Sequence, residues 1–146
     1  MIFLDDSGQF GLLVTPLAGH RMFRFQLIVE GQLIGDSEGC ILGSVMAQLK
    51  NRPRIDDERL DLLGIESAQF MELLADDEFL HDSTIMSSVE SLDRWTVYSY
   101  VRKKRFVIVA QEVSTRESGP ILTASVDEVA FNSIVDAARG YWLNSQ

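Results

Sequence analysis

One cysteine and two histidines are the side chains of this sequence that could form a nucleophilic dyad. Cys40 would act as the nucleophile with His20 or His81 as its base, because dyad partners need only meet in space. The residues around it, Glu38 to Ile41, form no motif of a catalytic cysteine. A thiol near the start of a helix has a lowered pKa, whereas a small thiol beside an apolar residue is an ordinary core side chain. We expect the core role and no catalytic activity.

Two runs of carboxylates, Asp56-Asp57-Glu58 and Asp76-Asp77-Glu78, have the oxygen ligands that Ca²⁺ and Mg²⁺ prefer. Neither run has the alternating acid spacing or the central glycine of an EF-hand loop. Two histidines and one cysteine do not make a tetrahedral zinc site unless carboxylates are added. Gly39 and Gly43 are isolated, and no GxGxxG or P-loop pattern occurs. We therefore expect no metal site and no cofactor.

Four consecutive basic residues, Arg102 to Arg105, stand between Tyr100 and Phe106. Basic groups interleaved with aromatic rings are typical of surfaces that bind single-stranded nucleic acid. The tip of a hairpin must also be polar and solvated, and four positive charges are few in a chain whose net charge is −9. Because attraction to phosphate dominates nucleic-acid affinity, we expect no nucleic-acid binding.

The excess of negative charge comes from one segment of 27 residues, Asp56 to Asp82, which we call the acidic segment. It contains ten acidic residues and one arginine, Arg59, and therefore carries −9. The other 119 residues contain 12 acidic and 12 basic residues, so their charges cancel. A field of one sign attracts a partner of the opposite sign and repels nucleic acid and anionic membranes.

Some of these acids stand where an isolated helix disfavours them. Asp76, Asp77 and Glu78 follow an apolar run near an expected helix end, where the helix dipole disfavours anions. Like charges four residues apart, such as Glu72 and Asp76, cost about 0.2–0.5 kcal/mol in a helix. Two interpretations stay open: a solvated face or one paired internally with Arg102–Arg105, and a docking surface for a basic protein. The candidate contact residues are Asp56, Asp57, Glu58, Asp61, Glu72, Asp76, Asp77, Glu78 and Asp82.

The elements that must position these residues begin with strands. Phe23 to Val29 alternates between apolar and polar residues, which is typical of a half-buried antiparallel strand. Further strands are predicted at Ile2 to Asp5 and Phe10 to Thr15. Asp36 or Ser37 is predicted to cap the next helix, in which apolar residues recur at helical spacing from Ile41 through about Lys50. The acidic segment is predicted to be helical, either as one helix or as two with a break at Gly64.

The second half of the chain is predicted to contain a β-hairpin, another strand and a helix. Trp95 to Val101 and Phe106 to Val113 carry apolar groups on both faces, which is typical of central strands. Ile121 to Ala124 predicts a further strand. Ser125 and Glu128 have the spacing of a capping box at the start of the last helix. We therefore predict one domain spanning residues 1–146 with an α+β fold, in which helices pack on one face of a mainly antiparallel β-sheet.

Motifs along nearly the whole chain combine into one layout. They are Met1-Ile2-Phe3-x-Asp5, Phe10-x-Leu12, Phe23-x-Phe25-Gln26-Leu27-Ile28-Val29-x-Gly31 with the helix after it, the hairpin Trp95 to Val113 and the final capped helix. This layout resembles the immunity proteins of bacterial polymorphic toxins, and most closely the immunity protein 42 family. Leu4 stands where we expect a glycine in that family, and the resemblance carries no binding residues across.

The resemblance implies an immunity (antitoxin) protein of contact-dependent growth inhibition that binds and neutralises one cognate toxin C-terminal domain. Such toxins are often nucleases with basic surfaces, so an acidic antitoxin would imitate the charge of their substrate. We expect a basic toxin domain as the partner, with no nucleic acid and no membrane. Tyr141 or Trp142, expected beyond the last helix, is a candidate anchor in the interface, although we expect a C-terminal aromatic residue to pack on the sheet instead.

A cytoplasmic location fits the start of the chain, because Met1 to Asp6 lacks the basic residues of a secretory signal. A single cysteine, which forms no intramolecular disulfide, also fits a reducing compartment. Two other functions stay open. One is an acidic adaptor or regulatory module without a toxin partner, and the other is a hydrolase that uses Cys40 with a histidine.

Overall fold

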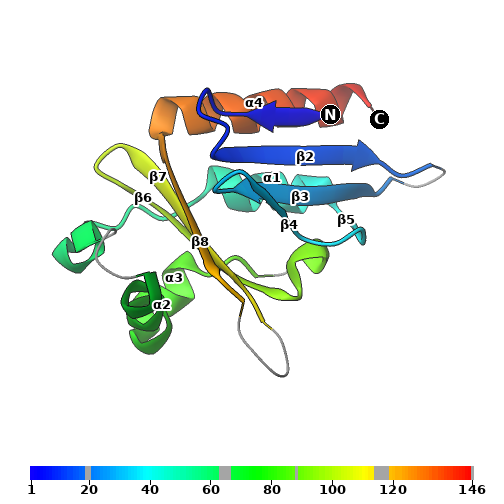
Figure 1. Ribbon diagram of the computed structural model, residues 1–146. Helices are drawn as coiled ribbons and strands as arrows, with labels where there is room; N and C mark the ends of the chain where they lie inside the picture. Colours follow the sequence, from blue (N-terminus) through cyan, green and yellow to red (C-terminus); the bar gives the residue numbers. More distant parts are fainter. Residues whose placement is uncertain (19–20, 63–66, 88, 114–118, 146) are drawn as a thin grey trace.

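The computed structural model describes residues 1–18, 21–62, 67–87, 89–113 and 119–145, which form two antiparallel sheets and four α-helices (Figure 1). The N-terminal sheet contains β1 (Ile2–Leu4), β2 (Phe10–Pro16), β3 (Phe23–Val29), β4 (Gln32–Ile34) and β5 (Gly39–Cys40). The C-terminal sheet contains β6 (Trp95–Arg102), β7 (Arg105–Glu112) and β8 (Ile121–Asp127). The helices are α1 (Leu42–Lys50), α2 (Ser67–Asp76), α3 (Glu78–Thr84) and α4 (Glu128–Asn144), with short 3₁₀ turns η1 (Glu58–Leu62) and η2 (Glu90–Leu92).

The N-terminal sheet is built around β3, where alternation of apolar and polar residues makes every second side chain buried. Its strands follow the order β1-β2-β3-β4, and β5 also pairs with β3. Leu12 lies opposite Leu27, so the apolar faces of β2 and β3 coincide. The turn from β3 to β4 has positive φ at Glu30 and Gly31, as a two-residue type I′ turn requires. The strands predicted from alternation are confirmed. The helix cap predicted at Asp36 or Ser37 is wrong, because Gly39–Cys40 forms β5 and α1 begins only at Leu42.

The C-terminal sheet has apolar residues on both faces, as predicted for the hairpin. Phe106 and Ile108 of β7 enter one cluster of buried residues, and Val107 and Val109 enter another. β7 is the central strand, as predicted, whereas the prediction of a central strand is wrong for β6, which is at one edge. The outer side of β6 forms bridges with Arg54 and with Ile85. A sheet that is apolar on both faces must be covered on both sides.

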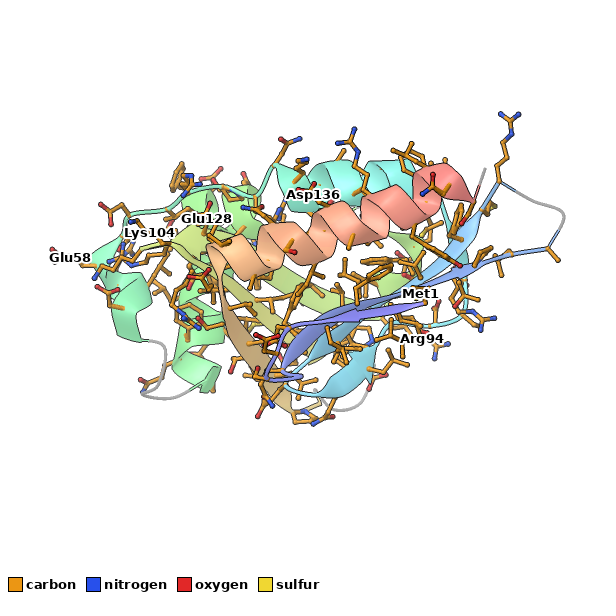
Figure 2. All side chains as sticks on the ribbon, turned by 90° about the horizontal axis from the view of Figure 1, so that it is seen from above. Met1, Glu58, Arg94, Lys104, Glu128 and Asp136 are labelled. Atoms are coloured by element: carbon orange, nitrogen blue, oxygen red, sulfur yellow. The ribbon has the colours of Figure 1, made fainter. Side chains whose placement is uncertain are left out.

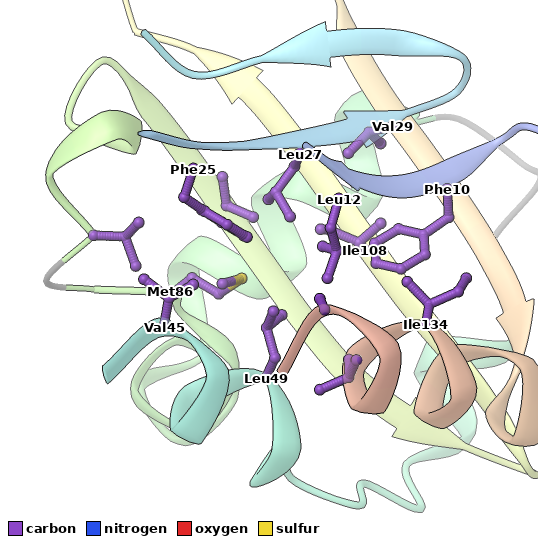
Figure 3. Close-up of a cluster of buried hydrophobic side chains, with 14 of the residues drawn as sticks. Phe10, Leu12, Phe25, Leu27, Val29, Val45, Leu49, Met86, Ile108 and Ile134 are labelled. Carbon is purple, nitrogen blue, oxygen red and sulfur yellow. The ribbon is translucent and has the colours of Figure 1, made fainter. Parts of the chain in front are cut away.

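The main core lies between the N-terminal sheet, one face of the C-terminal sheet, α1 and α4. Figure 2 shows α4 running alongside α1, and the two helices contact each other. Side chains that meet in this core include Phe10, Leu27, Leu49, Ile108 and Ile134 (Figure 3). Each is almost completely buried.

The second core lies on the other face of the C-terminal sheet, where η1, α2 and α3 cover it (Figure 1). Its residues include Leu60, Phe70, Leu74, Tyr100 and Val107. The predicted α+β class is confirmed. The arrangement differs from one sheet covered on one face, because there are two sheets and the C-terminal sheet carries helices on its second face as well.

The start of α4 differs from the predicted capping box. Ser125 is still in β8, because β8 remains paired with β7 as far as Asp127 opposite Arg105. The N-cap is Asp127, whose Oδ1 accepts a hydrogen bond from the backbone N–H of Val129 at 2.9 Å. The Ser125 hydroxyl instead accepts a hydrogen bond from Arg105 Nε at 2.7 Å. A strand pairing between distant parts of the chain therefore overrides the local capping pattern.

Three aromatic rings join the N-terminal sheet, the C-terminal sheet and α4. The rings of Phe106 and Phe131 stack with centroids 3.8 Å apart and planes 9° apart. Phe10 packs against both in tilted contacts, at 5.1 Å from Phe106 and 5.7 Å from Phe131. Offset and tilted arrangements of this kind add to the free energy gained from burial.

We expect Phe131→Ala to lower the free energy of unfolding by about 3–5 kcal/mol, because it removes a buried ring from the contact between both sheets and α4. Val129→Ala is the control on the same helix, since Val129 is 77% exposed, and it should change this free energy by less than about 0.5 kcal/mol. Denaturant unfolding followed by circular dichroism measures both values. Equal effects of the two substitutions would contradict the packing described.

Candidate functional site

The acidic segment covers the second face of the C-terminal sheet and turns its carboxylates outward. Leu60, Phe70 and Leu74 of this segment are buried against the sheet. The described acids beside these apolar positions, such as Glu72 and Asp76, are therefore left on the outer surface. Figure 2 shows that Glu58 lies at the same end of the molecule as Lys104 in the tip of the β6–β7 hairpin.

Arg102 links the hairpin tip to the acidic segment. Its Nε and Nη2 atoms donate to both carboxylate oxygens of Asp61 at 2.9 and 2.8 Å, and Nη1 donates to Asp56 at 2.7 Å. Lys103 Nζ adds a second cation to Asp61 at 2.8 Å. The hydrogen bonds from Arg102 and Lys103 hold the pKa of Asp61 well below its usual range. The guanidinium of Arg102 is almost completely buried, with 5% of its side chain exposed.

Arg59 joins two other acids of the segment. Its guanidinium donates to Asp57 at 2.7 Å and to Asp77 at 2.9 Å. Asp77 also caps α3, since its Oδ1 accepts the backbone N–H of Leu80 at 3.1 Å. This backbone hydrogen bond and the contact with Arg59 lower the pKa of Asp77, and the hydrogen bond from Arg59 lowers that of Asp57.

The structure explains much of the unusual placement of Asp76, Asp77 and Glu78. The chain ends α2 at Asp76 and starts α3 at Glu78, so two of the three acids stand at a helix N-terminus. There the helix dipole favours negative charge. The helix break therefore falls at Asp77, while the predicted break at Gly64 lies outside the described residues. Internal pairing with the basic tip, left open above, is observed for Asp56 and Asp61.

Five candidate contact residues have no ion pair within the described parts of the chain and are exposed. We call them the acidic face: Glu58, Glu72, Asp76, Glu78 and Asp82. Phe79 lies among them in the first turn of α3, with 69% of the residue exposed. It lines a groove of about 570 Å³ together with Arg54 to Arg59. The contact role of all nine predicted acids stays a prediction.

Sequence analysis did not single out Phe79. A helix of seven residues buries one stripe, and in α3 this stripe contains Leu80 and Thr84. Phe79 is one residue from Leu80, about 100° around the helix, and points away from the core. The signal in the sequence for an exposed aromatic residue was a phenylalanine that directly follows Asp77 and Glu78.

The predicted anchors Tyr141 and Trp142 are helix residues, because α4 continues to Asn144. Both are half-buried and pack against the main core. Tyr141 lies 6.0 Å from the ring of Phe3, and the ring of Trp142 lies over Gly43. Tyr141 and Trp142 therefore pack against the main core of this protein.

Cys40 and His81, the two described groups of the candidate dyad, have contacts in different cores. Cys40 belongs to the main core, and burial with the nearby charge of Glu90 raises the pKa of its thiol to about 11. His81 Nδ1 lies 2.9 Å from the hydroxyl of Tyr98, a residue of the second core. His20 lies outside the described residues. A protonated, buried thiol is a poor nucleophile, so this arrangement does not support the hydrolase interpretation.

Within the described ranges, no three side chains of His, Cys, Asp or Glu are grouped so that they could hold a metal ion. No helix in the same ranges is long and apolar enough to cross a membrane.

Comparison with known proteins gives one informative match. No family model and no curated protein matches the sequence. The crystal structure of CdiI from Burkholderia dolosa AUO158 matches the fold with a TM-score of 0.64 and 14% sequence identity. The match covers 97% of this chain and 99% of that chain. The two proteins therefore share a fold from end to end, while membership of the immunity protein 42 family stays a prediction.

We expect the stability of this protein to depend on the ionisation of Asp61. Its pKa in the folded state lies below the value of about 3.9 in an unfolded chain. The pairing with Arg102 and Lys103 therefore contributes fully above about pH 4 and is lost as the pH falls through the folded-state pKa. Asp61→Asn should be less stable at neutral pH and show a flatter loss of stability between about pH 4 and pH 2.

Denaturant unfolding at a series of pH values measures this effect. Asp93→Asn is the control, since Asp93 is exposed and makes no ion pair with any described residue. Parallel pH profiles for Asp61→Asn and the wild type would show that the pairing adds nothing to stability.

We expect Cys40 to react with a thiol reagent such as Ellman's reagent at least about tenfold more slowly in the folded protein than in guanidinium chloride, because its thiol is buried and protonated. The rate of absorbance change at pH 8 measures it. Reaction of the folded protein at the rate of an exposed cysteine would restore Cys40 as a candidate nucleophile.

Proposed function

We propose that this protein is an immunity protein of contact-dependent inhibition, which binds a cognate toxin domain in the cytoplasm and neutralises it without catalysis. The observation that carries the proposal is the match to the fold of CdiI over nearly the whole of both chains. CdiI is an immunity protein of contact-dependent inhibition. The raised pKa and complete burial of the Cys40 thiol support a binding role over the hydrolase alternative.

The partner that best fits the surface is basic. The four paired acids hold Arg59, Arg102 and Lys103 in place, so the five residues of the acidic face are left to interact outside the chain. Charge complementarity raises association rates to about 10⁸–10⁹ M⁻¹s⁻¹ at low salt. A nuclease needs a cationic surface to hold phosphates. We therefore propose a basic nuclease domain as the toxin.

Phe79 supplies the apolar contact that such an interface needs. Most of the binding energy of a protein interface comes from a few aromatic or arginine residues enclosed by a polar rim. Phe79 is an exposed aromatic ring, and Glu78 and Asp82 of the same short helix flank it. Ile55, almost completely buried, lies in the wall of the adjoining groove. Phe79 therefore replaces Tyr141 and Trp142 as the proposed anchor.

The first experiment is co-expression with the toxin domain encoded by the adjacent gene, followed by purification at several salt concentrations. The proposal expects survival of the host cell and a complex that resists dilution. It also expects association to slow as salt screens the charges. If the cells die and no complex forms, the antitoxin function is wrong.

Reversal of charge on the acidic face tests the surface itself. We expect the combined variant Asp76→Lys, Glu78→Lys and Asp82→Lys to associate with the toxin at least about tenfold more slowly at low salt, because it places like charges opposite each other. The effect should shrink as salt is added. Phe79→Ala should mainly speed dissociation, since it removes a buried anchor rather than a steering charge.

The matched control is Asp6→Lys, Glu38→Lys and Asp93→Lys, which changes the net charge equally at exposed acids outside the acidic face. Surface plasmon resonance gives both rates, and thermal unfolding checks that each variant is folded. Equal slowing in both triple variants would mean that only total charge matters. No slowing in the first would remove the acidic face from the proposed interface.

A further inference from the structure

Tyr100 is completely buried in the second core, and its hydroxyl has no hydrogen-bond partner among the described residues. Tyr98, two residues earlier on the same face of β6, places its hydroxyl 2.9 Å from His81 Nδ1. Leaving a buried hydroxyl unpaired costs the free energy of its desolvation, which phenylalanine would avoid. The hydroxyl of Tyr100 therefore lowers the stability of the free protein, and no hydrogen bond to a described residue compensates for this cost.

Tyr100 lines a pocket of about 150 Å³ beside the hairpin tip. Three cations, Arg102, Lys103 and Arg105, line the same pocket with one acid, Asp61. The pocket therefore has an excess of positive charge in a chain whose net charge is −9. Leu60 and Val107 give it an apolar part.

The spare hydrogen-bonding capacity of this pocket consists mainly of donors. Arg105 uses two of its N–H groups, on the hydroxyl and the backbone carbonyl of Ser125 at 2.7 and 2.6 Å. A guanidinium has five such groups, and an ammonium has three, of which Lys103 uses one on Asp61. Burial raises the pKa of Tyr100, so its hydroxyl stays protonated and able to donate. The matching ligand is an acceptor with negative charge.

The size of the pocket limits this ligand. A volume of about 150 Å³ corresponds to roughly five water molecules at about 30 Å³ each. This space suits a carboxylate on a short aliphatic stem, whose methylene groups would contact Leu60 and Val107.

We propose that the pocket formed by Tyr100, Lys103 and Arg105 binds a carboxylate group on a short aliphatic stem, with the Tyr100 hydroxyl as one of its donors. Glutamate side chains of a partner protein and free short-chain carboxylic acids both carry this group. Lys103 lines the pocket and is exposed, so its side chain is free to move toward solvent when a ligand enters. The proposal does not depend on the toxin assignment.

The test is a titration of the ¹⁵N-labelled protein, followed by amide chemical shifts. The probes are sodium propionate and N-acetylglutamate amide. Sodium chloride at equal ionic strength controls for ionic strength, and N-acetylglutamine amide is the uncharged control. We expect saturable shifts at Tyr100 to Arg105 and at Ser125 with the two carboxylates. We expect none with chloride or with the glutamine derivative.

Tyr100→Phe should weaken carboxylate binding by about tenfold or more, since a hydrogen bond to a charged group is lost. The same variant should unfold at an equal or higher denaturant concentration than the wild type, which separates loss of a ligand contact from loss of fold. Tyr98→Phe is the matched control and should bind carboxylate like the wild type.

Three results would overturn the proposal. One is the absence of saturable shifts with either carboxylate, and another is equal carboxylate affinity in Tyr100→Phe and the wild type. The third is equal binding of the glutamine and glutamate derivatives. If N-acetylglutamate amide binds at least as tightly as propionate, the carboxylate comes from a protein side chain, whereas binding of propionate alone assigns the pocket to free acids.

Discussion

The C-terminal sheet cannot be stable in water with either face uncovered, and this constraint organises the molecule. Its strands present apolar side chains on both faces, so a layer must pack on each. The N-terminal sheet with α1 and α4 covers one face, and the acidic segment covers the other. The segment uses Leu60, Phe70 and Leu74 as its inward contacts, which leaves its acids pointing outward. One side of the protein is thus strongly negative because the segment that covers the second face of this sheet is the acidic one.

Ion pairs as well as apolar contacts hold the acidic segment on the C-terminal sheet. Arg102 is held almost out of solvent between Asp56 and Asp61, and removing one partner of such a pair leaves an uncompensated charge. The acidic segment carries −9, and the two positive charges of Arg102 and Lys103, which pair with it, bring the sum to −7. Arg102 and Lys103 of the basic tip therefore serve the fold, while Lys104 and Arg105 are exposed and make no ion pair with a described residue. Part of the remaining negative charge lies close to Phe79, which shares a groove with Glu58 and a helix with Glu78 and Asp82.

Local patterns in the sequence were sufficient to predict most helices and strands, but they were insufficient to predict the contacts between these elements. Alternation from Phe23 to Val29 identifies β3 because burial on one face is a property of neighbouring residues. Ser125 fails as a helix cap because β7, which pairs with it, lies about twenty residues earlier. The pairing of Arg102 with Asp61 spans 41 residues and was one of two open possibilities. The exposure of Phe79 and the unpaired hydroxyl of Tyr100 depend on which face of an element is covered, and no local pattern encodes that.

The match to CdiI at 14% identity carries the fold but not the surface. Cores accept many apolar residues of suitable size, so a backbone arrangement persists while its sequence changes. Recognition depends instead on particular charges and anchors, which must be read from this chain. Here the acidic face with its aromatic ring and the small pocket with positive charge are both built partly from the acidic segment, which supplies Glu58 to the first and Leu60 and Asp61 to the second. If one partner occupied both the acidic face and the proposed pocket, it would present cations and a carboxylate in a fixed relative position. A purely basic surface would then be a poorer match, because it would satisfy the acidic face and leave the pocket's cations unmatched.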